Sequence, residues 1–235
     1  MMLMIESKQN SHYKKWLKLK TKKYRDLYDQ FLVYGPHLVE YAKKYDAIVE
    51  EISTQTETKG TLISKDLMTT LQQTQTSYDV MAVCKKTNPV IQSHKILVLD
   101  DVQDPDNVGA LIRSASAFGF HHVILSHKSA DTYNEKTIRA SQGAIFDVYI
   151  ERKPLNEAIV KLKQEGYQVI CADARGSQKT INNDKIILIM GNEGHGISKD
   201  IMALADARIA LPTQKVESLN VSVAGGILMY IWRQQ

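Results

Sequence analysis

The sequence predicts an α/β protein in which a small N-terminal α/β module precedes a larger domain built on a parallel sheet. Two observations support this class. From residue 96 onward, short runs rich in Val, Ile and Leu alternate with helical patterns, as in parallel strands that are covered on both faces. The 235 residues, 43% hydrophobic and 24% charged, suit one large or two ordinary globular domains.

The N-terminal part has helical and strand patterns in alternation. Residues 8–28 are helical with a break near Thr21, Pro36 suits the first turn of a helix, and Ser64 suits an N-cap. The predicted elements after residue 28 are a helix over 35–45, a strand over 47–52, a helix over 64–73 and a strand over 78–85. The Asn-Pro pair and polar residues of 85–95 predict a linker.

The C-terminal part has a regular alternation, with Gly119 and Gly166 as the expected ends of two helices. The predicted strands are 95–102, 121–126, 146–151, 167–174, 185–190 and 207–212. The predicted helices are 106–119, part of 134–145, 154–166, 198–205 and 218–233. We find no internal repeat.

Charge and cysteine content narrow the possible settings. The net charge of +4 permits a nucleic-acid partner without requiring one. Cys84 and Cys171 lie far apart without metal-ligand spacing, so we expect two buried, reduced cysteines and no metal site. The apolar stretch at the N-terminus is too short for a signal peptide, and no apolar run reaches the about 20 residues that span a bilayer. We therefore expect a cytoplasmic protein without a membrane partner.

Most of the charge excess lies in residues 8–28, which hold seven lysines and Arg25 against one acid, Asp26. One interpretation is a solvated helix face, with lysines opposite an apolar stripe. The other is a surface that contacts RNA phosphates and bases, because basic charge here is interleaved with aromatic residues. The concentration of charge favours the second interpretation. The expected stripe consists of Tyr13, Trp16, Leu17, Leu27 and Tyr28.

Three constellations in the C-terminal part could carry chemistry, and the first is residues 104–119. Apolar residues at helical spacing form a buried face, and Arg113 projects from a side otherwise made of small residues such as Gly109 and Ser116. A long cation on such a floor suits a phosphate or ribose. Alternatively, Asn107 is only an N-cap and Arg113 only a surface arginine.

The second constellation is the loop Gly191 to Gly196, in which the order G-x-x-G-x-G and the late position argue against a dinucleotide or P-loop site. The glycines indicate a sharp turn or a close approach. Glu193, which we expect to be buried, would repel phosphate and suits a hydroxyl, an amide or a cation.

The third constellation, residues 210–232, places Ser218 and Asn220 at a helix start, and N-capping explains only one of them easily. Gly225 and Gly226 each cost about 1 kcal/mol relative to Ala inside a helix. We therefore expect another backbone, helix or subunit to pack there.

Together, "DPDNVGALIRSASAFG", "SQGA", "IMGNEGHGIS" and "LPTQKVESLNVSVAGG" resemble the SpoU (TrmH) branch of the SPOUT RNA methyltransferases over residues 96–235. The N-terminal module is similar to the ribosomal-protein-like RNA-binding domain that many such enzymes carry. The resemblance implies a substrate-binding domain over 1–90 and, over 91–235, a SPOUT domain with a deep trefoil knot that works as a homodimer. This sequence departs mildly from the family pattern in "PTQKVESLN", where relatives usually carry a methionine and a glycine after the proline.

The activity that the resemblance implies is 2′-O-ribose methylation of structured RNA with S-adenosylmethionine. The cofactor-binding positions would be Met190, Gly191, Leu211, Ser218 and Leu219. The active-site positions would be Asn107, Arg113, Glu193, Ser218 and Asn220. A sulfonium methyl is already electrophilic, so the chemistry needs alignment and proton management rather than a metal.

Within that site, Arg113 is expected mainly to orient the target phosphate and ribose, because guanidinium keeps its proton in almost any protein setting. Asn107 and Asn220 would position Arg113 or the ribose, and Glu193 and Ser218 would shape the pocket floor. We expect the RNA to be large-subunit (23S) ribosomal RNA. The alternatives are a tRNA 2′-O-methyltransferase, a SPOUT enzyme that methylates a base, and a catalytically idle RNA-binding or ribosome assembly factor.

Overall fold

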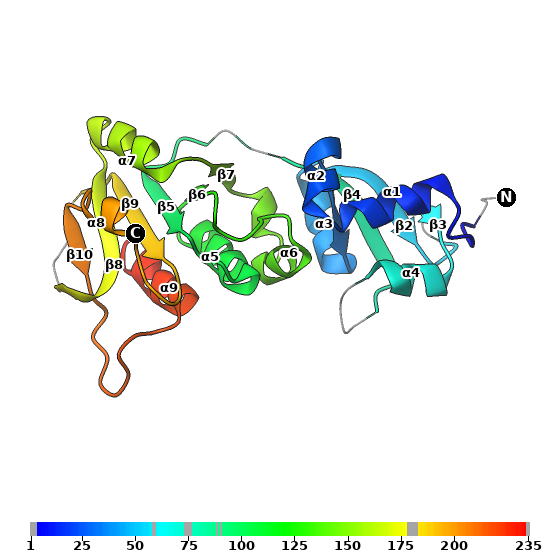
Figure 1. Cartoon of the computed structure of the whole chain (residues 1–235). Helices are drawn as coiled ribbons and strands as arrows, with labels where there is room; N and C mark the ends of the chain where they lie inside the picture. Colours follow the sequence, from blue (N-terminus) through cyan, green and yellow to red (C-terminus); the bar gives the residue numbers. More distant parts are fainter. Residues whose placement is uncertain are drawn as a thin grey trace.

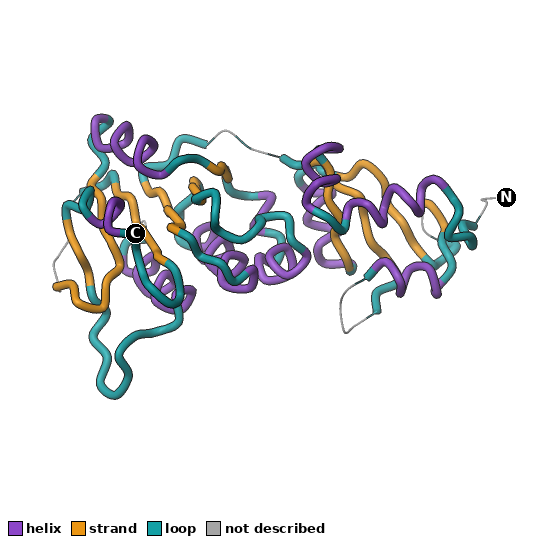
Figure 2. Tube along the Cα trace, viewed as in Figure 1, coloured by secondary structure: helices purple, strands orange, loops and turns teal. Residues whose placement is uncertain are grey.

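The computed structural model describes residues 4–57, 60–72, 77–87, 89, 91–177 and 183–233. The two predicted parts appear as two separate sheets with their own helices (Figure 1). Strands of the C-terminal sheet have helices on both faces (Figure 2), as the alternating pattern predicts. The predicted α/β class with a parallel C-terminal sheet is confirmed, while the trefoil knot stays a prediction.

The N-terminal part contains a four-stranded sheet in the order β1-β4-β2-β3, in which only β2 and β3 are parallel. Its helices are α1 (Ser11–Leu19), α2 (Lys22–Tyr28), α3 (Pro36–Lys44) and α4 (Lys65–Leu71). Its strands are β1 (Gln30–Tyr34), β2 (Ile48–Ser53), β3 (Thr61–Leu62) and β4 (Val80–Lys85). The break at Thr21 and the Ser64 cap occur where predicted, whereas β1 and β3 were missed.

The C-terminal part contains six parallel strands in the order β10-β8-β9-β5-β6-β7. The strands are β5 (Lys95–Asp100), β6 (His122–Leu125), β7 (Tyr149–Arg152), β8 (Gln168–Ser177), β9 (Ile186–Gly191) and β10 (Ala207–Ile209). The helices are α5 (Pro105–Ala117), α6 (Glu135–Ser141), the 3-10 turn η1 (Ala144–Phe146), α7 (Leu155–Gln164), α8 (Lys199–Met202) and α9 (Val221–Ile231).

Side-chain alternation on the central strands builds a core on each face of this sheet. Leu97 and Leu99 of β5 pack with α5 and α9 on one face, whereas Ile96 and Val98 pack with α7 and α8 on the other. Every residue of β5 and β9 is buried, which explains why these strands read as continuous apolar runs. Cys84 and Cys171 are free and buried, as predicted.

The two parts share a core, so they are joined by packing as well as by the predicted linker. Phe31 and Val33 of β1 and Ala42 of α3 pack in one cluster with Ile138 of α6 and Phe146 of η1. Because Phe146 belongs to this core and to η1, the strand predicted from residue 146 begins instead at Tyr149. Residues 88 and 90 of the predicted linker lie outside the described residues.

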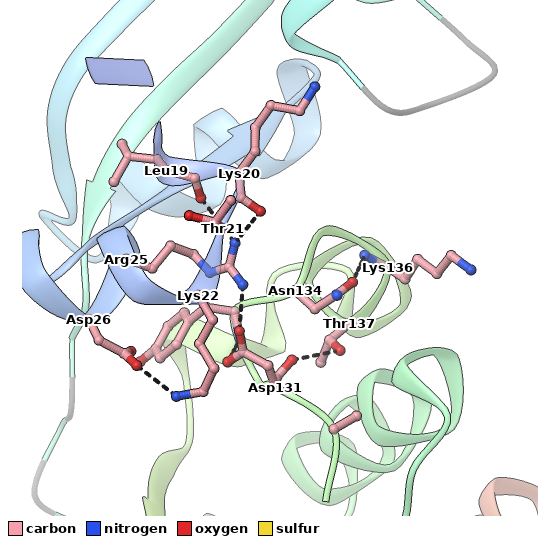
Figure 3. Close-up of polar contacts among 12 residues, drawn as sticks. Leu19, Lys20, Thr21, Lys22, Arg25, Asp26, Asp131, Asn134, Lys136 and Thr137 are labelled. Carbon is pink, nitrogen blue, oxygen red and sulfur yellow. Dashed lines mark hydrogen bonds and ion pairs between the residues drawn. The ribbon is translucent and has the colours of Figure 1, made fainter. Parts of the chain in front are cut away.

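Polar anchors hold the same junction. Arg25 of α2 donates to the carbonyl oxygens of Leu19 and Lys20 at 3.0 and 2.8 Å and to the Asp131 carboxylate at 2.5 Å (Figure 3). The Arg25 side chain is only 8% exposed. The predicted phosphate-contacting role of this arginine is therefore wrong: it ends α1 and joins the two parts. A second anchor is the Tyr45 hydroxyl, which donates to Asp147 at 2.6 Å.

Candidate active site

The carboxyl ends of β5 and β9 lie side by side, because Asp100 pairs in register with Gly191. From β5 the chain continues to β6 and β7 on one side, and it then crosses to β8 beyond β9. The order of the strands thus reverses beside β5, and ligands of open α/β sheets bind in the crevice at such a switch point. The loop after β5, residues 101–104, leads into the first predicted constellation, and the end of β9 with the loop after it, residues 191–197, carries the second.

The glycine loop after β9 closes on itself. The backbone N–H groups of Asn192 and Gly196 each donate to the other residue's carbonyl oxygen at 3.0 Å. A Cβ on Gly191 would lie 2.4 Å from backbone atoms of Gly196 and Ile197. The predicted close approach is therefore present, and its immediate cause is the loop's own backbone.

Asn192 ties this loop to the end of β5. Its Nδ2 donates to the Asp101 carbonyl oxygen at 2.9 Å, while its Oδ1 accepts from the Gly194 N–H at 2.8 Å. Asp101 has a φ of 58°, a left-handed conformation that is uncommon for a residue with a side chain. Sequence reasoning missed both residues. The signal available was the polar run that follows β5 directly, since polar residues at the carboxyl end of a buried strand often form sites.

Glu193 is the centre of a hydrogen-bond network between the two loops. Its carboxylate accepts from the backbone N–H groups of Gln103 and Asp104, both at 3.2 Å, and from Asn107 Nδ2 at 3.0 Å. Partial burial raises the pKa of the Glu193 carboxyl, but these hydrogen bonds outweigh it and hold the pKa below its ordinary value. The residue is exposed rather than buried as predicted, and its carboxylate is ionised.

Asn107 extends the network to the third constellation. Its Oδ1 accepts from Asn220 Nδ2 at 3.1 Å, and Asn220 Oδ1 in turn caps α9 by accepting from the N–H groups of Ser222 and Val223. Asn107 itself is not an N-cap, because Asp104 caps α5. The three predicted residues Asn107, Glu193 and Asn220 thus meet, although they lie on separate segments of the chain.

Arg113 and Ser218 stay outside this network. Arg113 is exposed and makes no hydrogen bond or ion pair with any residue that the structure describes. It lies six positions after Asn107, which corresponds to about 9 Å along the helix axis. The small residues beside it serve packing: a Cβ on Gly109 would lie 2.4 Å from the Thr137 carbonyl oxygen of α6. The floor predicted for a phosphate is therefore partly covered by α6.

The residues predicted to bind a cofactor lie around the same edge of the sheet. Met190 and Gly191 are buried at the end of β9, and Leu211 and Leu219 are half-buried at the two ends of a long exposed loop that contains Ser218. This loop extends away from the sheet between β10 and α9 (Figure 1). Among the described residues, no helix has the length and hydropathy of a membrane span, and no cluster of three or more His, Cys, Asp or Glu side chains suits a metal ion.

A parallel α/β sheet with polar loops that meet at its carboxyl edge, preceded by a second and smaller α/β module, defines a class of two-part α/β proteins with a candidate ligand site at the switch point of the sheet. The family model of the SpoU rRNA Methylase family matches residues 94–230, and the model of the MRM3-like substrate binding domain matches residues 10–90. The chain belongs to the SpoU rRNA methylase family.

Similar proteins support this assignment over the whole chain. The chain is 36% identical to the 23S rRNA (guanosine(2553)-2′-O)-methyltransferase RlmP of Bacillus subtilis, over 97% of this chain and 98% of that protein. It also matches a structure of a TrmH-family protein from Porphyromonas gingivalis with 30% identity, a TM-score of 0.83, and 97% and 99% coverage. An AdoMet-bound rRNA methyltransferase from Sinorhizobium meliloti matches with 25% identity, a TM-score of 0.83, and 97% and 96% coverage.

Proposed function

We propose that this enzyme transfers the methyl group of S-adenosylmethionine to a ribose 2′-hydroxyl of 23S ribosomal RNA in the cytoplasm. The observation that carries the proposal is the network of Glu193, Asn107 and Asn220, which joins three distant motifs at the carboxyl edge of the sheet. The similarity to RlmP favours 23S rRNA and the 2′-oxygen as targets, and the similarity to the S. meliloti enzyme favours this cofactor.

The residues at this edge of the sheet fit a nucleoside cofactor. Within residues 211–218, the backbone groups make no hydrogen bond to other backbone groups of the described chain. The Val216 carbonyl oxygen accepts from Thr213 Oγ1 at 2.6 Å, and the other backbone groups are available to contact an adenine edge and a ribose. Leu211 and Leu219 provide apolar contacts at the two ends of this loop, and Met190, at the end of β9, provides an apolar contact beneath the cofactor. S-adenosylmethionine supplies an electrophilic methyl group, and we assign Met190, Gly191, Leu211, Ser218 and Leu219 to its binding.

The geometry suggests distinct roles for the polar residues. The Glu193 carboxylate is occupied by three hydrogen bonds and has a lowered pKa, so it is a poor proton acceptor and serves to hold the two loops together. Asn107 and Asn220 fix the start of α5 against the start of α9. Arg113 has its donors free for the RNA and orients the target phosphate and ribose. Ser218, on the exposed loop, contacts substrate or cofactor.

Residues 1–90 act as the RNA-binding domain and residues 91–235 as the methyltransferase domain. In support, Lys14, Lys15, Lys18, Lys22 and Lys23 are exposed on α1 and α2, while Tyr13 and Trp16 on the opposite face are buried. Two half-buried tyrosines, Tyr24 and Tyr28, stack on this basic face. The Lys15 ammonium group lies 5.7 Å from the centre of the Tyr28 ring, and the Lys18 ammonium group lies 5.4 Å from the centre of the Tyr24 ring. Such a surface combines phosphate contacts with base stacking.

The enzyme acts as a homodimer through α9. Val223, Ile227, Tyr230 and Ile231 of this helix form an apolar stripe in which each side chain is between 39% and 56% exposed. A stripe of this kind on a soluble protein indicates a protein contact. We expect Ile227→Asp to convert a dimer to a monomer in sedimentation velocity, while Val160→Asp, at an exposed apolar position of α7, leaves the dimer intact. A monomeric unsubstituted protein would contradict the dimer.

The test of the function is incubation with ribosomal RNA and methyl-labelled S-adenosylmethionine. We expect label in alkali-resistant dinucleotides, because a 2′-O-methyl group blocks cleavage of the next phosphodiester. Label on a base would instead identify a base methyltransferase, and no label would identify an idle RNA-binding or assembly factor. Parallel reactions with 23S rRNA and with tRNA separate the two RNA targets, and we expect transfer to 23S rRNA.

A further inference from the structure

A cleft runs between α3 of the N-terminal part and α6 of the C-terminal part. Its volume is about 180 Å³. One wall includes His37 and Tyr78, and the other includes Arg139 and Gln142. Pockets that hold whole drug-sized ligands start at about 300 Å³, so this cleft has room for a single ring-sized group.

The walls of the cleft are held in place before any ligand binds. Gly35 has a φ of +87°, and a Cβ there would lie 3.0 Å from two ring carbons of Tyr78, so the glycine backbone packs directly against that ring. Across the cleft, His37 Nε2 lies 3.3 Å from the Gln142 carbonyl oxygen. The shared core and the Arg25 anchor described above fix α3 relative to α6. The cleft is therefore preformed.

The chemistry of the lining suits a nucleotide. His37 and Tyr78 offer aromatic faces, which stack on unpaired bases. Arg139 offers a guanidinium whose ion pair with Asp106 is long, 3.5 Å, and exposed on both sides, so exchange for a phosphate costs little. Glu135 also lines the cleft and repels a phosphate, so the phosphate must lie at the Arg139 end and the base inside.

Arg139 connects the cleft with the candidate active site through one ion pair. Asp106, the partner of Arg139, precedes Asn107, whose amide binds Glu193. The Arg139 guanidinium thus lies one ion pair away from the residue that precedes Asn107, so a nucleotide next to the target ribose could reach it. This link between Arg139 and the start of α5 favours RNA as the occupant over a free metabolite.

We propose that the cleft between α3 and α6 binds a nucleotide that flanks the methylated one, with its base against His37 and Tyr78 and its phosphate on Arg139. This inference rests on the proposed function and adds to it a second base-binding site, shared by both domains. Such a site would contribute to the choice of target sequence, because base contacts carry specificity whereas phosphate contacts mainly carry affinity.

Photo-crosslinking tests the placement directly. The full-length protein carries p-benzoylphenylalanine in place of His37 and is irradiated with an unmethylated transcript around the 2′-O-methyl site mapped in 23S rRNA. We expect crosslinks within about two nucleotides of the methylated one, and few from the same probe in place of Glu157, an exposed residue of α7. Crosslinks from the His37 position only to distant nucleotides, or none above the Glu157 control, would overturn the proposal.

Substitutions provide the second test. We expect Arg139→Ala to raise the dissociation constant for this RNA about fivefold or more and to reduce its salt dependence by about one phosphate contact. We expect His37→Ala to raise it about 5- to 100-fold through lost stacking. Lys136→Ala removes an exposed cation from the same helix outside the cleft and should have little effect. Equal effects of Arg139→Ala and Lys136→Ala would refute the cleft site, while failure of the unsubstituted protein to methylate would refute the proposed function instead.

Discussion

At the scale of single residues, the site depends on two asparagine side chains whose orientations are fixed by their hydrogen bonds. Asn107 uses its Nδ2 toward Glu193 and its Oδ1 toward Asn220, so the orientation of its amide is determined. Asn220 donates to Asn107 through its Nδ2 and caps α9 through its Oδ1. An asparagine that joins two loops in this way is difficult to replace, because no other side chain presents a donor and an acceptor with the same geometry.

A charge introduced at position 107 therefore tests this network. Asn107→Asp places two carboxylates about 3 Å apart, which raises the pKa of the pair, so we expect this variant to gain stability as the pH falls from 7 toward 5. In the unsubstituted protein the contribution of Glu193 has the opposite sign: its pKa is lowered, so the stability that it adds is complete above the ordinary value of 4.5 and is lost at lower pH. Melting temperatures between pH 4 and 8 measure both trends.

The control for that experiment is Asn107→Ala, which removes the hydrogen bonds without adding charge. Asn107 is buried, so we expect a loss of about 1–3 kcal/mol that is nearly constant between pH 5 and 8. Parallel pH profiles for the alanine and aspartate variants would contradict the assigned network.

Arg113 makes a separate prediction, because its role is in the reaction and not in the fold. Arg113→Lys keeps the charge but loses the planar fork, so we expect kcat/KM for RNA to fall about tenfold or more with little change in melting temperature. Arg175→Lys, at an arginine whose side chain is 90% exposed, is the matched control. Activity of the Arg113 variant near that of the unsubstituted protein would refute the orienting role.

At the scale of elements, glycines set how closely the helices around the site approach one another. At Gly109 the obstacle to a side chain is backbone, the Thr137 carbonyl oxygen at 2.4 Å. At Gly225 it is a side-chain end, Leu111 Cδ2, also at 2.4 Å. The tight packing predicted for the glycine pair of α9 is confirmed at Gly225, where the neighbour is α5.

This difference predicts an order of stability. Backbone cannot move aside, so we expect Gly109→Ala to cost about 1–3 kcal/mol or more despite the better helix propensity of alanine. Gly225→Ala should cost less, since Leu111 can adjust in part and propensity returns about 1 kcal/mol. Urea unfolding of the two variants gives the comparison, and a smaller loss at Gly109 than at Gly225 would contradict the packing described.

At the scale of the whole molecule, the two domains are held by a shared core with ionic contacts at its edge, so they behave as one unit. The Arg25–Asp131 pair is largely buried, with side chains 8% and 18% exposed, whereas Asp26 is 50% exposed between Lys22, which is 58% exposed, and Lys86, which is 16% exposed. Removal of one partner from a buried pair leaves a charge without compensation, while exposed pairs contribute little.

The two pairs give a matched prediction. We expect Asp131→Ala to lower the free energy of unfolding by about 3 kcal/mol or more and to divide a single unfolding transition into two. Asp26→Ala should cost about 1 kcal/mol or less, even though its lysine partners hold the pKa of Asp26 at about 2. Calorimetry of both variants tests this, and similar losses would show that Arg25 does not join the domains.

The extent of correct sequence prediction follows from the range of the interactions. Strand and helix patterns depend on neighbours in the chain, so nearly every element of the C-terminal part was located. Arg25 was misassigned because its partner, Asp131, lies 106 residues away. The small residues around Gly109 were interpreted as a floor for a ligand, because the close approach of α6 cannot be predicted from local spacing. Glu193 was predicted to be buried, but its hydrogen-bond partners hold it at the surface. The motifs located the site, but the contacts between them are tertiary.

The shared core also has a consequence for biosynthesis. Phe31, Val33 and Ala42 belong to the part of the chain that leaves the ribosome first, but their partners Ile138 and Phe146 are made much later. At synthesis rates of about 5–20 residues per second, the interval between residues 85 and 146 lasts about 3–12 s. During that interval an apolar face of a nearly complete domain lacks its cover. The nascent chain should therefore be most dependent on chaperones in this window, and a chain truncated before Ile138 should aggregate.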